Sequence, residues 1–252
     1  NVWCAAGKGT FGTDEVVRRV HATRLEEVVD HRKLVLPQLG ATGVAAHEVR
    51  KRSGFSVVYG PVRARDIKPF LAAGMKTTPE MRRVTFGTVD RLVLAPVELV
   101  MMLKKPTAKV ALLVFVLGGI GPGVFSVVDS WHRGLGALGV WLAGLLAGAV
   151  ATPVLLPWIP GRAFAAKGAL VGAFVAAWAA IRYWEVLGAL QGVALLLALP
   201  AVASYVAMNF TGASTFTSPS GVEKEMRRAI PAQAVAVAVA GIAWLGSAFV
   251  NG

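Results

Sequence analysis

Residues 135–156 of this 252-residue chain read LGALGVWLAGLLAGAVATPVLL, a stretch without a charged side chain. At about 1.5 Å per residue, a helix of this length covers the roughly 30 Å hydrocarbon core of a membrane. Glycine and alanine recur along the stretch, which permits close approach of neighbouring helices in a bundle. The stretch therefore predicts a transmembrane helix.

Four further apolar stretches follow the same pattern, and charged residues are distributed unevenly around them. Residues 1–105 hold 18 Lys and Arg and 10 Asp and Glu, whereas residues 106–252 hold 8 and 4. This asymmetry predicts two domains, an α/β domain over 1–105 and an all-α transmembrane domain over 106–252. The five transmembrane helices are predicted at about 109–128, 135–156, 163–181, 186–208 and 231–250.

The loops between these stretches predict the orientation in the membrane. Lys104, Lys105 and Lys109 lie on the N-terminal side of the first predicted helix. Because Lys and Arg accumulate in cytoplasmic loops, we expect a multi-pass protein of the cytoplasmic (inner) membrane, with residues 1–105 in the cytoplasm and the C-terminus outside. The same rule accounts for the formal net charge of +12. No nucleic-acid-binding motif accompanies the charge, so membrane lipid is an expected partner and nucleic acid is not.

Short strands and helices alternate in the N-terminal half, which is typical of a parallel sheet and a Rossmann-like α/β fold. Ligands of such sheets lie beyond the carboxyl ends of the strands, which Gly40, Gly60 and Pro61 mark here. A domain of about 100 residues is small for this fold, so we expect it to be N-terminally incomplete, with strands before Asn1. The predicted elements are helices at 14–29, 44–52 and 63–73, strands at 33–39 and 55–59, and at 92–103 either a strand leading into a helix or an interfacial segment.

The motif with the clearest chemical content is NVWCAAGKGTFGT, residues 1–13. Its glycine spacing is that of neither a phosphate-binding P-loop nor a dinucleotide fingerprint. Cys4 is the single cysteine of the chain, which excludes an intrachain disulfide and argues against a zinc or iron–sulfur cluster. Lys8, one helical turn further on, favours the metal-binding thiolate form. The alternative is an inert cysteine buried beside Trp3 in a core.

The run from Asn1 to Gly9 resembles the cap helix of the mercury-methylating corrinoid proteins, a family related to the large subunit of the corrinoid iron–sulfur protein of the acetyl-CoA pathway. In that family a cap-helix cysteine is the lower axial ligand of cobalt, and Cys4 matches it. The resemblance extends along residues 1–105, the five predicted spans and the loop from Asn209 to Met226. Another common corrinoid signature, Asp-x-His-x-x-Gly, is absent from the sequence, which leaves Cys4 or water as the lower ligand.

The resemblance implies a corrinoid-binding domain and a corrinoid-dependent methyltransferase. Its reaction would transfer a methyl group from methylcobalt(III) to mercuric ion, with a cobalamin-type cofactor and with Cys4 as catalytic residue and cobalt ligand. One alternative is a membrane-anchored corrinoid methyl carrier of an acetyl-CoA-type pathway; another is a non-enzymatic membrane protein such as a permease subunit. The implied cofactor-binding residues are Asn1, Val2, Trp3, Cys4, Ala5, Ala6, Gly7, Lys8, Gly9 and Thr10.

The implied reaction also predicts partners. Mercuric ion is an electrophile, so the methyl group leaves with its electron pair or as a radical, and cobalt must then be reduced before it accepts a methyl cation. The resemblance implies a ferredoxin-type protein with two [4Fe–4S] clusters as the electron donor, and a methyl donor protein or methyl-folate. The hydroxyl-rich stretch 209–228 is either a polar connector or a segment that folds back to complete the pocket. A basic face that would dock an acidic ferredoxin is formed by Arg18, Arg19, Arg50 and Arg52.

Overall fold

The computed structural model of the chain describes residues 2–103, 105–213 and 219–250, and for residues 3, 4, 105, 106, 211–213, 219 and 220 it describes the backbone alone. The chain forms two compact units, Asn1–Thr85 and Phe86–Gly252. The domain boundary predicted at residue 105 marks the change in the density of charged residues. The boundary between the two compact units lies earlier, between Thr85 and Phe86. Residues 86–103 belong to the C-terminal unit because helix α6 (Thr88–Met102) packs there.

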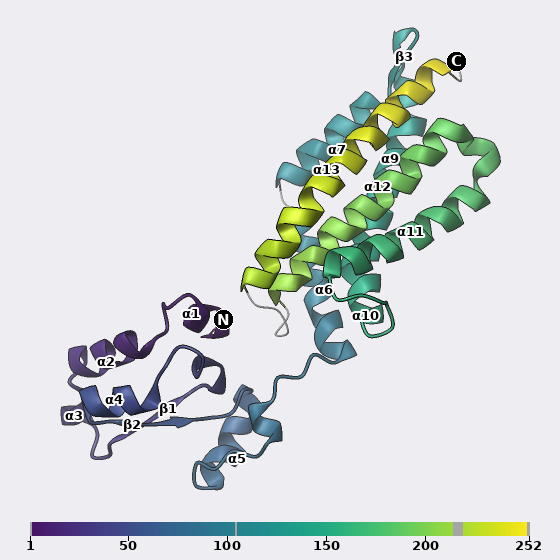
Figure 1. Cartoon of the computed structure of the whole chain (residues 1–252). Coiled ribbons are helices and arrows are strands. Elements are labelled where there is room, and N and C mark those ends of the chain that lie inside the picture. The colour runs from purple at the N-terminus through teal and green to yellow at the C-terminus, as the bar shows by residue number, and fades with distance from the viewer. Residues whose placement is uncertain (1, 104, 214–218, 251–252) are drawn as a thin grey trace. The chain divides into compact units, whose positions relative to one another are not determined.

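The N-terminal unit contains a small parallel sheet with helices on one face (Figure 1). Strands β1 (Lys33–Leu36) and β2 (Ser56–Tyr59) pair in parallel, with Leu34 opposite Val57. A buried cluster lies between this face and helices α2 (Thr13–Ala22) and α4 (Ala46–Ser53). It is formed by Val16, Val17, Val44 and Val49. The other elements are α1 (Val2–Gly7), α2 (Thr13–Ala22), α3 (Leu25–Val28), η1 (Gln38–Gly40), α4 (Ala46–Ser53), η2 (Ala64–Asp66), α5 (Ile67–Ala72) and η3 (Glu80–Arg82).

The predicted parallel pairing is confirmed, and so are the helix ends at two glycines. Gly54 follows α4 with φ of 73°, and Gly74 follows α5 with φ of 66°, backbone conformations that favour glycine. The single helix predicted over residues 14–29 is wrong. The Thr23 hydroxyl donates to the Arg19 carbonyl oxygen, and Arg24 adopts φ of 46°, so α2 ends before α3 begins.

The C-terminal unit is a bundle of helices. Among the described residues, four helices are long and apolar enough to cross a membrane, which indicates a multi-pass membrane protein: Val127–Leu155, Phe164–Arg182, Trp184–Phe210 and Gly221–Val250. These correspond to the last four predicted spans. The elements of the unit are α6, α7 (Lys105–Leu117), β3 (Ile120–Gly121), β4 (Val124–Phe125), α8 (Val127–Asp129), η4 (Ser130–Gly134), α9 (Leu135–Leu146), η5 (Ala147–Ala151), α10 (Thr152–Leu155), α11 (Phe164–Arg182), α12 (Trp184–Ala213) and α13 (Pro219–Val250).

The first predicted span, 109–128, is not one helix. Helix α7 ends at Leu117, and the antiparallel pair β3–β4 occupies residues 120–125. The sequence Gly-Gly-Ile-Gly-Pro-Gly at 118–123 explains the break, because glycine and proline weaken a helix and suit a tight turn. Arg133 fastens this hairpin to the bundle by donating to the carbonyl oxygens of Gly118, Ile120 and Trp244.

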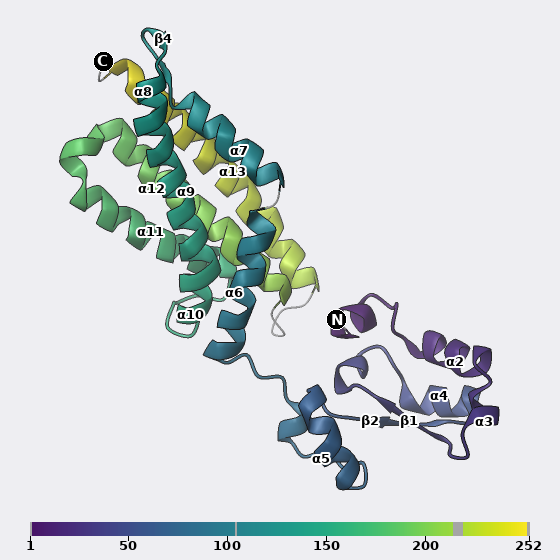
Figure 2. The same ribbon diagram turned by 180° about the vertical axis from the view of Figure 1, so that it is seen from behind.

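Helix α12 is the centre of the bundle and packs against α9, α11 and α13, as both views show (Figures 1 and 2). Glycines make this packing close. A Cβ atom added at Gly168 of α11 would lie 2.5 Å from both the Ala203 carbonyl oxygen and the Ala207 Cβ of α12. The predicted role of small residues in helix approach is thus confirmed at this contact.

A long-range contact closes the bundle at the start of α11. The carboxylate of Glu225, on α13, accepts a hydrogen bond of 2.6 Å from the backbone N–H of Ala165. Ala165 lies in the first turn of α11, where backbone N–H groups lack partners within the helix. A side chain 60 residues further along the chain therefore caps this helix.

Candidate functional site

The motif of residues 1–10 begins as a short helix. Val2–Gly7 form α1, and Cys4 lies in it, two residues from both Val2 and Ala6. Asn1 lies outside the described residues, and so do the side chains of Trp3 and Cys4. The predicted cap helix is therefore present as a helix, while the predicted cobalt ligation by the Cys4 thiol stays a prediction.

Backbone hydrogen bonds hold the motif in a compact turn. The Phe11 N–H and the Thr10 hydroxyl both donate to the carbonyl oxygen of Ala5, over 3.1 Å in each case. Gly9 adopts φ of 77°, which lets the chain reverse after α1. Thr10 is a predicted cofactor-binding residue, and its hydroxyl already donates a hydrogen bond to a carbonyl oxygen of α1.

The motif is fastened to the loop that follows β1. The Thr13 N–H donates to the Gly43 carbonyl oxygen over 3.2 Å, and the Ala45 N–H donates to the Thr13 hydroxyl over 2.9 Å. Helix α1 packs against η1, which follows β1 directly. The helix that carries Cys4 therefore lies at the carboxyl end of the parallel sheet, where α/β proteins bind ligands.

Gly43 is required for this arrangement. A Cβ atom at this position would lie 2.8 Å from the carbonyl oxygens of both Ala6 and Phe11. Gly43→Ala is expected to loosen the motif at a cost of about 1–3 kcal/mol, because backbone must shift to admit the methyl group. Amide hydrogen exchange at Phe11 and Thr13 should then become roughly 10- to 100-fold faster.

Gly7→Ala is the matched control, because no atom lies within 4 Å of a Cβ at that position. It should leave the exchange of the Phe11 and Thr13 amides unchanged. Equal protection in Gly43→Ala and Gly7→Ala would show that the loop does not depend on this contact.

A polar pocket of about 440 Å³ opens at the same edge of the sheet. Gln38, directly after β1 and Pro37, contributes a buried side-chain oxygen, Oε1, that has no hydrogen-bond partner in the described part of the chain. An unpartnered buried oxygen favours a ligand that donates a hydrogen bond. The residues that line the pocket are Gln38, Val58, Tyr59, Met75, Lys76, Thr77 and Arg82.

Charge and hydrogen bonding give the pocket a preference. Lys76 and Arg82 are both cationic, and the Arg82 Nε donates to the Thr77 hydroxyl over 2.5 Å. The Tyr59 hydroxyl donates to the Val44 carbonyl oxygen, and burial raises the pKa of this phenol above its usual range. Tyr59 is therefore neutral at physiological pH, and the pocket suits a ligand with anionic groups or amides.

Sequence reasoning identified the edge of the sheet but none of these lining residues. Gly40, Gly60 and Pro61 indicated that the strands end there. Lys76, Thr77 and Arg82 belong to a segment without regular hydrophobic periodicity, and the fold alone brings them beside Gln38. In the described part of the chain, no three His, Cys, Asp or Glu residues lie close enough to hold a metal ion.

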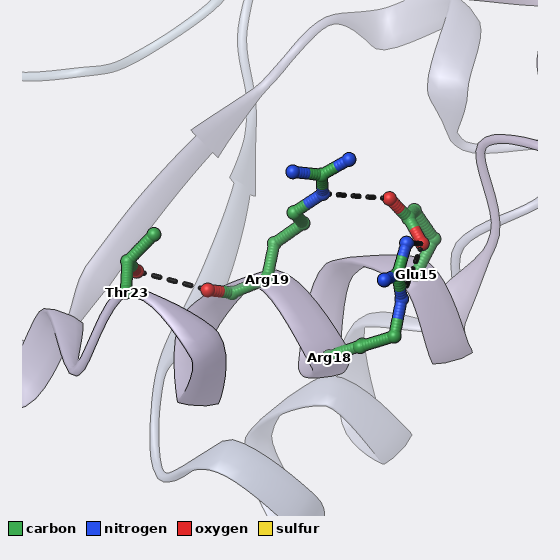
Figure 3. A network of polar contacts seen from close by, with 4 residues as sticks. All are labelled: Glu15, Arg18, Arg19 and Thr23. Atoms are coloured by element: carbon green, nitrogen blue, oxygen red, sulfur yellow. Dashed lines mark hydrogen bonds and ion pairs between the residues drawn. The ribbon is translucent and has the colours of Figure 1, made fainter.

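The predicted basic docking face is partly neutralised by its own acids. Glu15 accepts hydrogen bonds from the Nε atoms of Arg19, over 2.8 Å, and Arg18, over 2.9 Å (Figure 3). These bonds hold the pKa of the Glu15 carboxyl below its usual value, so the pairs contribute at neutral pH and are lost as the pH falls through that lowered pKa. Arg52 pairs with Asp14 over 2.5 Å. The face is therefore less positive than the arginines alone predict.

Comparison of the chain with protein-family models, with curated proteins and with solved structures finds no match.

Proposed function

We propose that this chain is a corrinoid-dependent methyltransferase of the cytoplasmic membrane that transfers a methyl group to mercuric ion, forming methylmercury. The observation that carries the proposal is the position of Cys4. It lies on a short helix fastened at the carboxyl end of a parallel sheet. Together with the resemblance of residues 1–9 to a corrinoid cap helix, this position supports a cofactor site at that edge.

The residues present fit such a cofactor in two respects. A corrin ring brings its own nitrogen ligands, so a single protein ligand would suffice for the cobalt, and Cys4 would offer it a soft sulfur donor. The edge of a corrinoid carries amide side chains, and its nucleotide tail carries a phosphate. Gln38 Oε1 suits an amide donor, and Lys76 and Arg82 suit the phosphate.

Each group of the chain has a definite task in this proposal. Bound corrinoid would supply the cobalt–carbon bond. The Cys4 thiolate would hold the cobalt and donate electron density to it, which would favour transfer of the methyl group to an electrophilic metal ion. Lys8, exposed and four residues after Cys4, would favour the thiolate by its charge.

The electron balance requires a partner. The methyl transfer that a bound corrinoid would supply consumes electrons. Residues 1–252 hold the single cysteine Cys4 and therefore too few thiolates for an iron–sulfur cluster, so the electrons would come from a separate donor. We propose a ferredoxin with two [4Fe–4S] clusters as that donor, and a methyl donor protein or methyl-folate as the methyl source. The positive-inside rule supports a cytoplasmic site for the N-terminal unit.

The direct test is reconstitution. Full-length protein, purified anaerobically in detergent with cobalamin, should retain the corrinoid and show an absorption spectrum altered by sulfur ligation. With methylated cofactor, mercuric ion and a reduced two-cluster ferredoxin, it should form methylmercury over several turnovers. Methyl transfer to a thiol or a nickel enzyme instead of mercury would favour the methyl-carrier alternative, and failure to retain any corrinoid would reject the proposal.

The pocket provides an independent prediction. Arg82→Ala should weaken cobalamin binding by roughly 10- to 150-fold, because one charge-assisted hydrogen bond contributes roughly 1.5–3 kcal/mol. Binding of cobinamide, which lacks the nucleotide tail, should stay unchanged. Absorption titration measures both affinities.

The neighbouring Arg83→Ala is the matched control, because Arg83 does not line the pocket. It should leave both affinities unchanged. An equal loss for cobalamin and cobinamide in Arg82→Ala would mean that this side chain does not contact the tail.

A further inference from the structure

Helix α6 has the reverse of the usual distribution of polar and apolar residues. Its two most buried charged residues, Arg91 and Glu98, are only 4% and 6% exposed. A helix on the surface of a soluble domain shows the opposite pattern, with apolar residues inside and charged residues outside. The apolar residues of α6 that are more than 40% exposed are Val89, Leu92, Val93, Val97, Val100 and Met101.

The packing of α6 explains this pattern. It lies against η5 and α10, which form the end of the membrane-crossing helix Val127–Leu155. Leu99 and Met102 pack on a buried cluster formed by Leu145, Ala149 and Val206. An apolar outer face beside a membrane-crossing helix is suited to contact with lipid.

Helix α7 continues the same path. It packs against η4 and α9, toward the other end of helix Val127–Leu155 (Figures 1 and 2). Thus α6 and α7 in succession run along the length of one membrane-crossing helix. Each is too short to cross alone, with 15 and 13 residues.

Glu98 is a buried acidic side chain on α6. Its Oε2 atom is buried and has no hydrogen-bond partner within the described residues. By contrast, buried Arg91 donates to the Gly87 carbonyl oxygen and the Thr88 hydroxyl. The facing segments η5 and α10, with the sequence AGAVATPVL, carry no titratable side chain. On α6 itself the other titratable groups are Asp90 and Arg91, two turns away, and Lys104, which follows α6, lies outside the described residues. On the neighbouring helices, Tyr205 precedes Val206 of α12, and Lys167 of α11 donates to the Leu156 carbonyl oxygen, directly after α10.

We propose that Glu98 is a proton-binding site within the membrane half of the protein, held on helix α6. Burial of an unpaired carboxylate in an apolar environment is unfavourable, and binding one proton removes that penalty. The ligand is a proton and not a metal ion, because a metal ion requires further ligands that the facing segments do not offer. Release of the proton requires α6 to move toward water. The proposal does not depend on the corrinoid chemistry.

Infrared spectroscopy of the full-length protein in lipid vesicles tests this directly. At pH 8 carboxyl groups in water are ionised, so a carboxylic-acid C=O band equal to about one group per chain should remain. Glu98→Gln should remove the band, and Glu185→Gln, at an exposed position, should retain it. Absence of the band from the wild-type protein, or its persistence in Glu98→Gln, would overturn the proposal.

A chemical test on the wild-type chain covers the case in which Glu98→Gln fails to fold. A lipid-soluble carbodiimide adds a protonated carboxyl group across one C=N bond, and the acyl group then migrates to nitrogen without loss of atoms. Trypsin releases residues 92–104, in which Glu98 is the one acidic residue, and residues 84–91, which contain Asp90. Modification of the first peptide supports the proposal, and modification confined to other peptides contradicts it.

Discussion

Replacing Cys4 by alanine is expected to abolish methylmercury formation. The substitution removes the sulfur that would donate electron density along the cobalt–carbon axis, and water is a weaker donor. The loss should exceed the roughly 10- to 100-fold effect typical of residues that only support a metal ligand. Product formation from mercuric ion under reducing conditions, with equal amounts of corrinoid-loaded protein, measures it.

Two controls separate this effect from damage to the fold. Lys8→Ala leaves the sulfur in place and should lower the rate much less than Cys4→Ala. Cys4→Ala should retain bound corrinoid, because the pocket around Gln38 is unchanged, but its spectrum should lose the signature of sulfur ligation. Full methylmercury formation by Cys4→Ala would eliminate the thiolate mechanism and leave the corrinoid assignment without its main support.

Replacing Gly168 by leucine is expected to prevent assembly of the bundle. The space beside Gly168 is filled by Ala203 and Ala207 of α12, each with an atom 2.5 Å from an added Cβ. One methyl group at this site should cost about 1–3 kcal/mol, and a leucine side chain cannot be admitted without separating α11 from α12. Because α12 also packs against α9 and α13, the whole unit should lose its cooperative thermal transition in detergent.

Gly136→Leu is the matched control, since Gly136 also lies in a membrane-crossing helix and has no atom within 4 Å of its Cβ position. It should unfold at nearly the wild-type temperature. If Gly168→Leu unfolds at that temperature as well, α11 and α12 do not pack as closely in the membrane as in the structure.

The long apolar helices could be predicted from the sequence because the mean hydropathy of a stretch is a simple average over its residues and does not depend on tertiary contacts. The stretch 135–156 and the three that follow it each became part of a long apolar helix. The stretch 109–128 has similar hydropathy, but its glycines and Pro122 determine the local backbone instead, and a hairpin forms. Average hydropathy does not register this difference, since glycine counts as nearly neutral.

Helix α6 was harder to predict for a related reason. Residues 92–103 are apolar with Glu98 and Pro96 inside, and the sequence left both a strand leading into a helix and an interfacial segment open. Which face of α6 is buried depends on η5 and α10, about 50 residues away. Burial of Arg91 and Glu98 therefore arises from tertiary packing and not from any local pattern.

One part of the candidate site could be predicted from the sequence, and the other part could not. Cys4 was found by resemblance of a short motif, and the edge of the sheet by the rule for parallel strands. Gln38, Lys76 and Arg82 are brought together by loops, and no spacing in the sequence connects them. The hydroxyl-rich residues 214, 215, 217 and 218 lie outside the described residues, so both interpretations of that stretch stay predictions.

The carboxylate of Glu225 at the start of α11 has a consequence for biogenesis. During synthesis, Ala165 leaves the ribosome 60 residues before its partner on α13 does. The N-terminus of α11 must therefore enter the translocon with its first N–H groups hydrogen-bonded to water or lipid headgroups. A nascent chain arrested before Glu225 would expose this helix end to quality-control proteases, and completion of the last helix would end that vulnerability.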